Sequence, residues 1–186
     1  MGGIIVGSII GILVLILIIT IIVMYNNLIK YSVRVDNGWS QIDVQMKQRY
    51  DLIPNLVETV KAYAVHEKNT LNEVTKWRAA AINAKTPEEM IRSNQKLSGA
   101  IANIFATAEN YPDLKANHNF LDLQRQLKDL EEKIAFARQF YNDTVMKYNE
   151  YIRRFPSNII ANIFHYRERQ YFEMTEEEKA VPKVQF

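Results

Sequence analysis

Apolar side chains fill the start of the chain without interruption by charge. Residues 4–24 are nearly all isoleucine, leucine and valine, and the first charged side chain is Lys30. A helix needs about 20 apolar residues to cross the ~30 Å hydrocarbon core of a bilayer. A cleaved signal peptide, the alternative, would have a basic start, a shorter apolar stretch and a small-residue cleavage site. We therefore predict an uncleaved, single-pass anchor over residues 1–29 that contacts lipid through residues 4–25, with Tyr25 at the lipid–water boundary.

Beyond this anchor, apolar residues recur at alternating steps of four and three, as they do along a helix packed lengthwise on its neighbours. Two long series follow this spacing: Val35, Trp39, Ile42, Met46, Ile53, Leu56, Val60 and Tyr63, and then Phe120, Leu123, Leu127, Leu130, Ile134, Ala137, Tyr141, Thr144, Tyr148 and Ile152. Helix breakers are few, since only Gly38 and Gly99 follow Met24 as glycines. The pattern predicts an all-α fold, with an N-terminal transmembrane helix followed by an up-and-down bundle of long helices.

Prolines and capping residues indicate where these helices end. Thr86 can cap a helix, Pro87 suits the first helical position, and Glu89 completes a capping box. The apolar spacing runs through Pro54 unbroken, so we expect a kink there, with a break as the alternative. We predict helices near 4–53 and 54–84, joined as one kinked rod, and further helices over 87–110, 117–155 and 157–172. The corresponding domains are an anchor (1–29), a helical bundle (30–172) and a C-terminal tail (173–186).

Composition and charge exclude several classes of function. The chain has no cysteine, and its net charge of +2 comes without the clustered lysines and arginines of a nucleic-acid-binding face. His66-Glu67 lacks the second histidine that a zinc-protease helix needs four residues on, where Thr70 stands. The sequence contains neither a glycine-rich phosphate loop nor a nucleophile elbow. We therefore expect no catalytic residue, no metal, no cofactor and no nucleic-acid partner.

Two features leave alternatives open. Arg49 occupies an otherwise apolar position of the first series, so it is either buried beside an acid from a neighbouring helix or packed along its stem with its head in water; we favour the second. The segment 159–169 mixes apolar bulk with basic ends. It lies either on a membrane surface or against the bundle, and we favour packing on the bundle.

Basic residues near the anchor predict its orientation. Lys30, Arg34, Lys47 and Arg49 all follow the apolar run, and no basic side chain precedes it. Segments rich in lysine and arginine next to a membrane helix tend to stay in the cytoplasm. We therefore expect a cell-membrane protein whose bundle lies on the cytoplasmic side.

Helix lengths suggest self-association. At about 1.5 Å per residue, a rod from 30 to 84 is too long for the helix at 87–110 to cover, so residues 30–53 would lack a full-length partner in their own chain. Either Pro54 breaks the rod and this part folds onto the bundle, or its apolar residues Val35, Trp39, Ile42 and Met46 pack against a second copy; we favour the second copy. Gly3, Gly7 and Gly11 share one helix face and allow close approach of a second membrane helix, although glycine is also simply common in such helices. We therefore expect a homo-oligomer held by these residues.

Several segments resemble the LemA family. The matching segments are Val-Asp-Asn-Gly-Trp-Ser-Gln-Ile-Asp-Val-Gln at 35–45, Arg-Tyr-Asp-Leu-Ile-Pro-Asn-Leu-Val-Glu-Thr-Val-Lys at 49–61, Tyr-Pro-Asp-Leu-Lys-Ala-Asn at 111–117, Ala-Arg-Gln-Phe-Tyr-Asn-Asp at 137–143, Phe-Pro-Ser-Asn at 155–158 and Pro-Lys-Val-Gln-Phe at 182–186. The resemblance implies a bacterial or archaeal protein with an N-terminal anchor, long helices and no established catalytic activity; a family relative in magnetic bacteria is linked to building magnetosome membranes. It supplies no catalytic residues. The polar residues of these segments that we select as a candidate partner surface are Asp51, Asn55, Glu58, Asn142 and Asp143.

Three functions remain to be compared. The leading interpretation is a non-catalytic, membrane-bound scaffold that displays a helical surface to protein partners or to copies of itself. A module that organises or remodels the membrane is the second. An enzyme comes last, because it needs a polar pocket that the sequence does not show.

Overall fold

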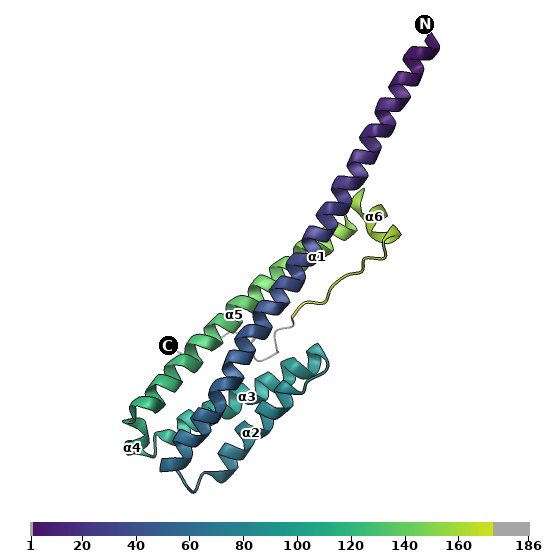
Figure 1. Ribbon diagram of the computed structural model, residues 1–186. Helices are drawn as coiled ribbons and strands as arrows, with labels where there is room; N and C mark the ends of the chain where they lie inside the picture. Colours follow the sequence, from purple (N-terminus) through teal and green to yellow (C-terminus); the bar gives the residue numbers. More distant parts are fainter. Residues whose placement is uncertain (1, 173–186) are drawn as a thin grey trace, which may run out of the picture. The chain divides into compact units, whose positions relative to one another are not determined.

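The computed structural model describes residues 2–172, and every regular element in this range is a helix (Figure 1). The helices are α1 (Gly2–Tyr63), α2 (Lys68–Ile82), α3 (Pro87–Ala108), α4 (Pro112–Lys115), α5 (His118–Arg153) and α6 (Ser157–Ile163). This confirms the predicted all-α fold. The predicted tail, 173–186, lies outside the described residues.

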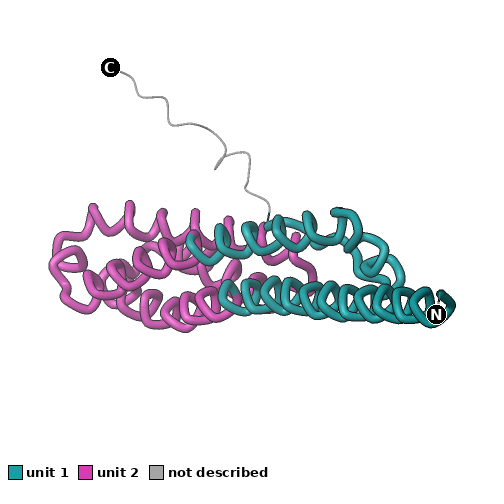
Figure 2. Tube along the Cα trace, turned by 90° about the horizontal axis from the view of Figure 1, so that it is seen from above, with its two compact units in different colours: residues 1–42, 136–186 teal, residues 43–135 magenta. Residues whose placement is uncertain are grey.

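The chain forms two compact units, coloured separately in Figure 2. Unit 1 consists of residues 1–42 and 136–186, and unit 2 of residues 43–135. Helices α1 and α5 each contribute to both units, because the division falls within them. Unit 2 also contains α2, α3 and α4, whereas unit 1 contains α6.

In unit 2, the first helix ends twenty-odd residues earlier than the sequence indicates. We expected a rod continuing to residue 84, but α1 ends at Tyr63 and the chain reverses through residues 64–67 before α2 begins. Ala64 is fully buried, and a carboxylate oxygen of Glu67 accepts a hydrogen bond from the Tyr111 hydroxyl at 3.1 Å. Tertiary contacts therefore stabilise a reversal that contains neither glycine nor proline.

Pro54 neither ends α1 nor leaves its backbone unsatisfied. A proline inside a helix has no N–H to donate to the carbonyl four residues earlier. Here that carbonyl belongs to Tyr50, and it accepts a hydrogen bond of 2.7 Å from the Nε of Arg78 on α2. The alternative of a break at Pro54 is wrong, since the helix continues for nine further residues to Tyr63. The neighbouring helix replaces the donor that proline lacks.

The predicted helix start at Thr86 and Pro87 is confirmed. Thr86 caps α3 by accepting a hydrogen bond from the Glu89 amide at 3.1 Å, with Pro87 in the first turn. The Glu89 carboxylate accepts from the amide of Lys85 at 2.9 Å, one residue before the position a capping box uses. Asn117 caps α5, because its side-chain oxygen accepts from the Phe120 amide at 3.0 Å.

In unit 1, the part of α1 that follows its apolar stretch packs along α5. The ring of Tyr31 lies 5.0 Å from that of Tyr151, and the ring of Trp39 lies 5.5 Å from that of Tyr141, so the two helices run antiparallel. A Cβ on Gly38 would lie 3.3 Å from the Cα of Tyr141, which means that glycine permits this close approach. The prediction that residues 30–53 lack a partner in their own chain is therefore wrong. The unforeseen reversal at 64–67 changes the direction of every later helix, and α5 returns along α1.

The last predicted helix is also shorter than expected. We expected a helix over 157–172, but α6 ends at Ile163 and an extended segment follows (Figure 1). His165 has a φ of 58°, in the left-handed region, and the amide of Tyr166 donates to the carbonyl of Ala161 at 2.9 Å. This is the Schellman arrangement that ends many helices, usually with glycine at the left-handed position. Histidine is among the residues that tolerate that conformation.

Candidate functional site

The extended segment, residues 165–172, is held on α5 by two asparagines. Asn149 donates from its side-chain amide to the carbonyl of Arg169 at 2.9 Å and accepts from the amide of the same residue at 2.9 Å. Asn142 makes the same pair of hydrogen bonds with Phe172, at 3.0 and 2.8 Å. The two asparagines are seven residues apart and therefore share one face of the helix, about 10 Å apart along its axis. Each asparagine side chain pairs with the N–H and the C=O of one residue of the segment, as the backbone of a neighbouring β-strand would.

Two tyrosines next to these asparagines bind the same segment. The hydroxyl of Tyr141 donates to the carbonyl of Gln170, and that of Tyr148 donates to the carbonyl of Arg167, both at 2.9 Å. Burial raises the pKa of both tyrosines, and the positive charge of Arg169 offsets this only in part. We call Tyr141, Asn142, Tyr148 and Asn149 the Tyr-Asn site.

Side-chain contacts fix the two ends of the segment. Near its start, Arg153 donates to the carboxylate of Glu168 at 2.7 Å, and this hydrogen bond lowers the pKa of Glu168. At its end, the Phe172 side chain is 4% exposed, with its ring 6.2 Å from that of Trp39 and the guanidinium of Arg138 4.7 Å from it. The extended segment is thus bound through its backbone in the middle and through side chains at both ends.

Sequence reasoning missed the Tyr-Asn site, although a signal exists. The dipeptide Tyr-Asn occurs at 141–142 and again at 148–149, which places both copies on the same helix face. The apolar spacing predicts Tyr141 and Tyr148 only as core positions, and the family-like segments predict Asn142 only as a residue for a partner. The structure places Asn142 half-buried and bonded within the chain, while Asp143 is exposed.

The other candidate partner residues lie in unit 2. Asp51, Asn55 and Glu58 are all exposed on α1, and their spacing of four and three places them on one face. Asn142 and Asp143 belong to unit 1. The structure therefore brings together three of the five candidates on one helix face, and their role in binding a partner remains a prediction.

Arg49 is buried, so our preference for a head in water is wrong. The residue is 2% exposed, its guanidinium lies 2.9 Å from the carboxylate of Glu131 on α5, and it donates to the hydroxyl of Ser98 on α3 at 2.8 Å. Beside it, the Tyr50 hydroxyl donates to the side-chain oxygen of fully buried Asn94 at 2.9 Å. This polar cluster joins α1, α3 and α5 inside unit 2. The alternative considered for Arg49, an acid on a neighbouring helix, is correct.

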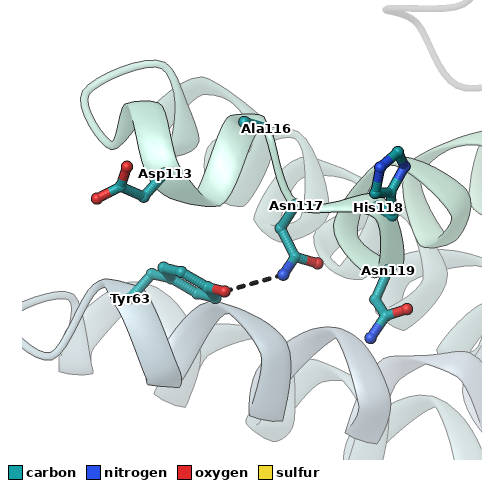
Figure 3. A pocket seen from close by; sticks show the side chains of 6 residues that line it. All are labelled: Tyr63, Asp113, Ala116, Asn117, His118 and Asn119. Carbon is teal, nitrogen blue, oxygen red and sulfur yellow. Dashed lines mark hydrogen bonds between the residues drawn. The ribbon is translucent and has the colours of Figure 1, made fainter.

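A shallow pocket of about 420 Å³ lies near the end of α1 in unit 2 (Figure 3). Its lining residues are Tyr63, Asp113, Ala116, Asn117, His118 and Asn119. The side-chain amide of Asn117 donates to the Tyr63 hydroxyl at 2.9 Å, and its oxygen caps α5. These polar groups stabilise the local fold. Within residues 2–172, no group of three or more acidic or histidine side chains is placed to hold a metal ion.

The proposed self-association residues fall into two environments. A Cβ added to Gly3, Gly7 or Gly11 would meet no atom within 4 Å. By contrast, Val35, Ile42 and Met46 are at most 2% exposed, and Trp39 is half-buried. The second group therefore belongs to the core of the chain, and the argument from an uncovered stripe no longer applies. Self-association itself remains a prediction.

Of the helices in the described part of the chain, α1 alone is long and apolar enough to cross a membrane. Its most apolar stretch is wholly unburied by the rest of the protein. Length and composition are the whole basis of this assignment, which makes α1 a candidate membrane anchor.

These features define an all-α protein with a candidate N-terminal anchor, whose helical body uses its polar side chains largely to hold its own backbone. The sequence profile of the LemA family matches residues 38–186, and the chain belongs to this family. The resemblance noted in the sequence is thus confirmed.

Curated relatives share low identity with the chain. "Protein LemA" of Metamycoplasma hominis is 26% identical over 73% of this chain and 63% of its own length. "Magnetosome protein MamQ 2" of Paramagnetospirillum magneticum is 23% identical over 83% of this chain and 66% of its own length. "Magnetosome protein MamQ" of Magnetospirillum gryphiswaldense is 23% identical over 82% of this chain and 66% of its own length. The chain spans less than two thirds of the length of these relatives.

Proposed function

We propose that the chain is a non-catalytic scaffold, anchored in the cell membrane by one pass of α1, that presents its helical surface to protein partners. One observation carries this proposal: the apolar stretch and the body share a single helix, Gly2–Tyr63. The anchor is wholly unburied, whereas the later part of the helix has a buried apolar side. Because the helix is continuous, no loop separates the apolar stretch from the part of α1 that follows it.

The partner surface in this proposal is the exposed face of α1 formed by Asp51, Asn55 and Glu58. Two carboxylates and an amide on one face favour a partner with lysines, arginines or amide donors. The basic residues after the anchor favour a cytoplasmic location for this face.

Photo-crosslinking in native membranes tests this function. A photoreactive amino acid at position 55 should yield discrete adducts with a protein, and the same amino acid at exposed Lys128 on α5 should not. Asp51→Lys combined with Glu58→Lys should remove the adducts from position 55, because the charge of the surface is reversed. Equal adducts from both positions, or adducts that survive the charge reversal, would contradict the partner surface.

A second function, organisation of the membrane, has support of its own. Two of the relatives described above carry the name "Magnetosome protein". In addition, α6 exposes Ile159 and Ile163 in the unit that contains the anchor. If this function is correct, adding the purified protein to vesicles should change their diameter, measured by electron microscopy, and a protein that leaves vesicles unchanged at high density would exclude it.

A further inference from the structure

Helix α6 is apolar on two sides, although only one side packs on the protein. Ile160 and Ala161 are buried in unit 1, with exposed fractions of 6% and 2%. On the other side, Ile159 and Ile163 are 48% and 62% exposed. A short surface helix that ends a bundle normally places polar residues there. The exposed side therefore requires a second explanation.

Two exposed phenylalanines flank α6 in the sequence. Phe155 precedes α6 and is 75% exposed, and Phe164 follows it and is 47% exposed. Together with the two isoleucines, they give four large apolar side chains in a stretch of ten residues. We call Phe155, Ile159, Ile163 and Phe164 the α6 apolar face.

The α6 apolar face lies where α1 leaves its apolar stretch. The ring of Phe164 lies 4.5 Å from that of Tyr25, and the hydroxyl of Tyr151 donates to the carbonyl of Met24 at 3.1 Å. Leu28, one turn further along, is fully buried. Figure 1 shows α6 beside α1 in this region. All of these contacts lie within unit 1.

The length of the apolar stretch sets the level of the membrane surface. Residues 4–24 form a helix of about 31 Å, which matches the hydrocarbon core of a bilayer. The boundary therefore falls near Met24 and Tyr25, and tyrosine is enriched at that level. Because Phe164 contacts Tyr25, the α6 apolar face is at the boundary rather than in bulk water.

We propose that α6 is an interfacial helix, which inserts the α6 apolar face into the surface of the bilayer that α1 crosses. This inference rests on the proposed membrane anchoring of α1. Lipid is the occupant that the geometry favours, because the face continues the apolar surface of the anchor at the level where acyl chains end. The flanking side chains Arg154, His165 and Arg167 are exposed, as is usual for residues at the level of lipid headgroups.

This contact gives unit 1 a defined rotation about its anchor. A single transmembrane helix leaves the attached body free to turn about the membrane normal and to tilt. A second lipid contact beside the anchor restricts both motions. The extended segment follows α6 directly and is bound to α5 by the Tyr-Asn site, so unit 1 as a whole is oriented towards the membrane.

Depth-dependent fluorescence quenching tests the proposal on the full chain. The protein has no cysteine, so single cysteines can carry an environment-sensitive dye at Ile163→Cys, at Ile16→Cys in the anchor, and at Lys147→Cys on an exposed position of α5. Each protein is reconstituted into vesicles of phosphatidylcholine and phosphatidylglycerol containing nitroxide lipids, labelled either near the headgroup or deep in the acyl chain. We expect the dye at 163 to be quenched by the shallow nitroxide, the dye at 16 by the deep one, and the dye at 147 by neither.

The three positions separate failure of this inference from failure of the proposed function. Quenching at 16, with the dye at 163 behaving like that at 147, would overturn the interfacial helix and leave the anchor intact. An absence of quenching at 16 would overturn the anchor itself. A blue-shifted dye at 163 that no lipid nitroxide quenches would show that protein, such as a second copy, covers the face, and this outcome also overturns the inference.

A pair of substitutions controls for the label. Ile159→Gln in the Ile163→Cys protein should abolish shallow quenching at 163, because it removes apolar area from the inserted side. Ile159→Leu should preserve the quenching. Both proteins should retain their helix content by circular dichroism, since Ile159 is outside the core. Shallow quenching that persists unchanged in the Ile159→Gln protein would contradict insertion of this face.

Discussion

At the scale of single residues, His165 determines where the chain changes from helix to extended backbone. Its φ of 58° is available to glycine and tolerated by asparagine and histidine, but it is strained for β-branched residues. The sequence does not reveal this position, because the usual glycine is absent. In the structure, the backbone hydrogen bond from Tyr166 to Ala161 marks the end of α6.

We predict that His165→Val destabilises the end of α6 by about 1–2 kcal/mol, because a β-branched side chain at this φ clashes with its own backbone. Faster hydrogen exchange at the amide of Tyr166 would report the change. His165→Asn is the matched control and should leave that exchange rate close to that of the parent chain. Equal protection in the valine and asparagine proteins would contradict the assignment of strain to this position.

Gly38 and Gly99 allow a comparison of close packing with open space. Each glycine lies inside a helix, where alanine is favoured by about 1 kcal/mol. A Cβ at position 99 meets no atom within 4 Å, whereas one at 38 lies 3.3 Å from both the Cα of Tyr141 and the hydroxyl oxygen of Thr144. Alanine at position 38 and alanine at position 99 should therefore change the free energy of unfolding by different amounts or in opposite directions.

We predict that Gly99→Ala raises the free energy of unfolding by about 0.5–1 kcal/mol. Gly38→Ala should fail to show this gain, and Gly38→Leu should lower stability by about 1–3 kcal/mol, because the side chain would push α5 away from α1. Urea denaturation of the detergent-solubilised protein, followed by circular dichroism, measures all three. A Gly38→Leu protein as stable as the parent would contradict the close approach.

At the scale of elements, a hydrogen bond from Arg78 to the Tyr50 carbonyl links α2 to α1 and replaces the one that Pro54 cannot make. Periodicity predicted that the helix passes through Pro54, and it does. The sequence could not indicate which group would bind the carbonyl of Tyr50. Arg78 lies on α2, whose residues we predicted to continue the rod of the first helix. Helix α2 is separate from α1 because the chain reverses at residues 64–67, where tertiary contacts stabilise the turn. The spacing of apolar residues carries no information about such contacts.

We predict that Arg78→Met lowers the free energy of unfolding by about 1–3 kcal/mol, because the Tyr50 carbonyl loses a charged donor. In a Pro54→Ala background the same substitution should have a smaller effect, since the residue at 54 then supplies its own N–H to that carbonyl. Denaturation of the four proteins of this double-mutant cycle measures the coupling. Additive effects of the two changes would show that Arg78 acts independently of Pro54.

The Tyr-Asn site should make attachment of the extended segment sensitive to alkaline pH. Burial raises the pKa of Tyr141 and Tyr148, so the bound state holds their protons more tightly than the released state, whose tyrosines titrate near the ordinary value of about 10. The stabilisation is therefore complete below about pH 10 and is lost as pH rises through the raised values.

Trp39 can report this release, because its ring lies 6.2 Å from that of Phe172. In a Trp77→Phe protein, we expect the emission of Trp39 to change in a transition above pH 10. Replacing Tyr141 and Tyr148 by phenylalanine should remove that transition. A transition that persists in the phenylalanine protein would originate elsewhere.

At the scale of the whole molecule, the sequence predicted the fold class, the family and the candidate anchor, but not the path of the chain. Apolar periodicity predicts which residues are buried, but it does not predict which helix or which copy of the chain covers them. The series from Val35 to Ile53 is correctly assigned as a packed face, but in unit 1 its Trp39 packs on Tyr141 of α5 in the same chain. The prediction for Arg49 was wrong for the same reason, because its partner Glu131 is distant in the sequence and comes close only in the folded chain.

This distinction yields a decisive substitution. Trp39→Glu together with Ile42→Glu would dissociate an oligomer if these residues faced another copy, and would leave each chain helical. In the structure Ile42 is fully buried, and the ring of Trp39 packs 5.5 Å from that of Tyr141 within the same unit. Burial of an unpaired carboxylate at either position costs several kcal/mol.

We therefore predict that the double substitution lowers helix content and the midpoint of thermal unfolding in detergent, measured by circular dichroism, instead of merely changing the molecular mass. Gly7→Leu with Gly11→Leu is the complementary variant, because the surroundings of both glycines are open and the body is untouched. It should keep full helix content, and if the anchor helices pair, light scattering should show a lower mass. A Trp39→Glu, Ile42→Glu protein with parental helix content and a reduced mass would instead place the contact between copies on the body of α1.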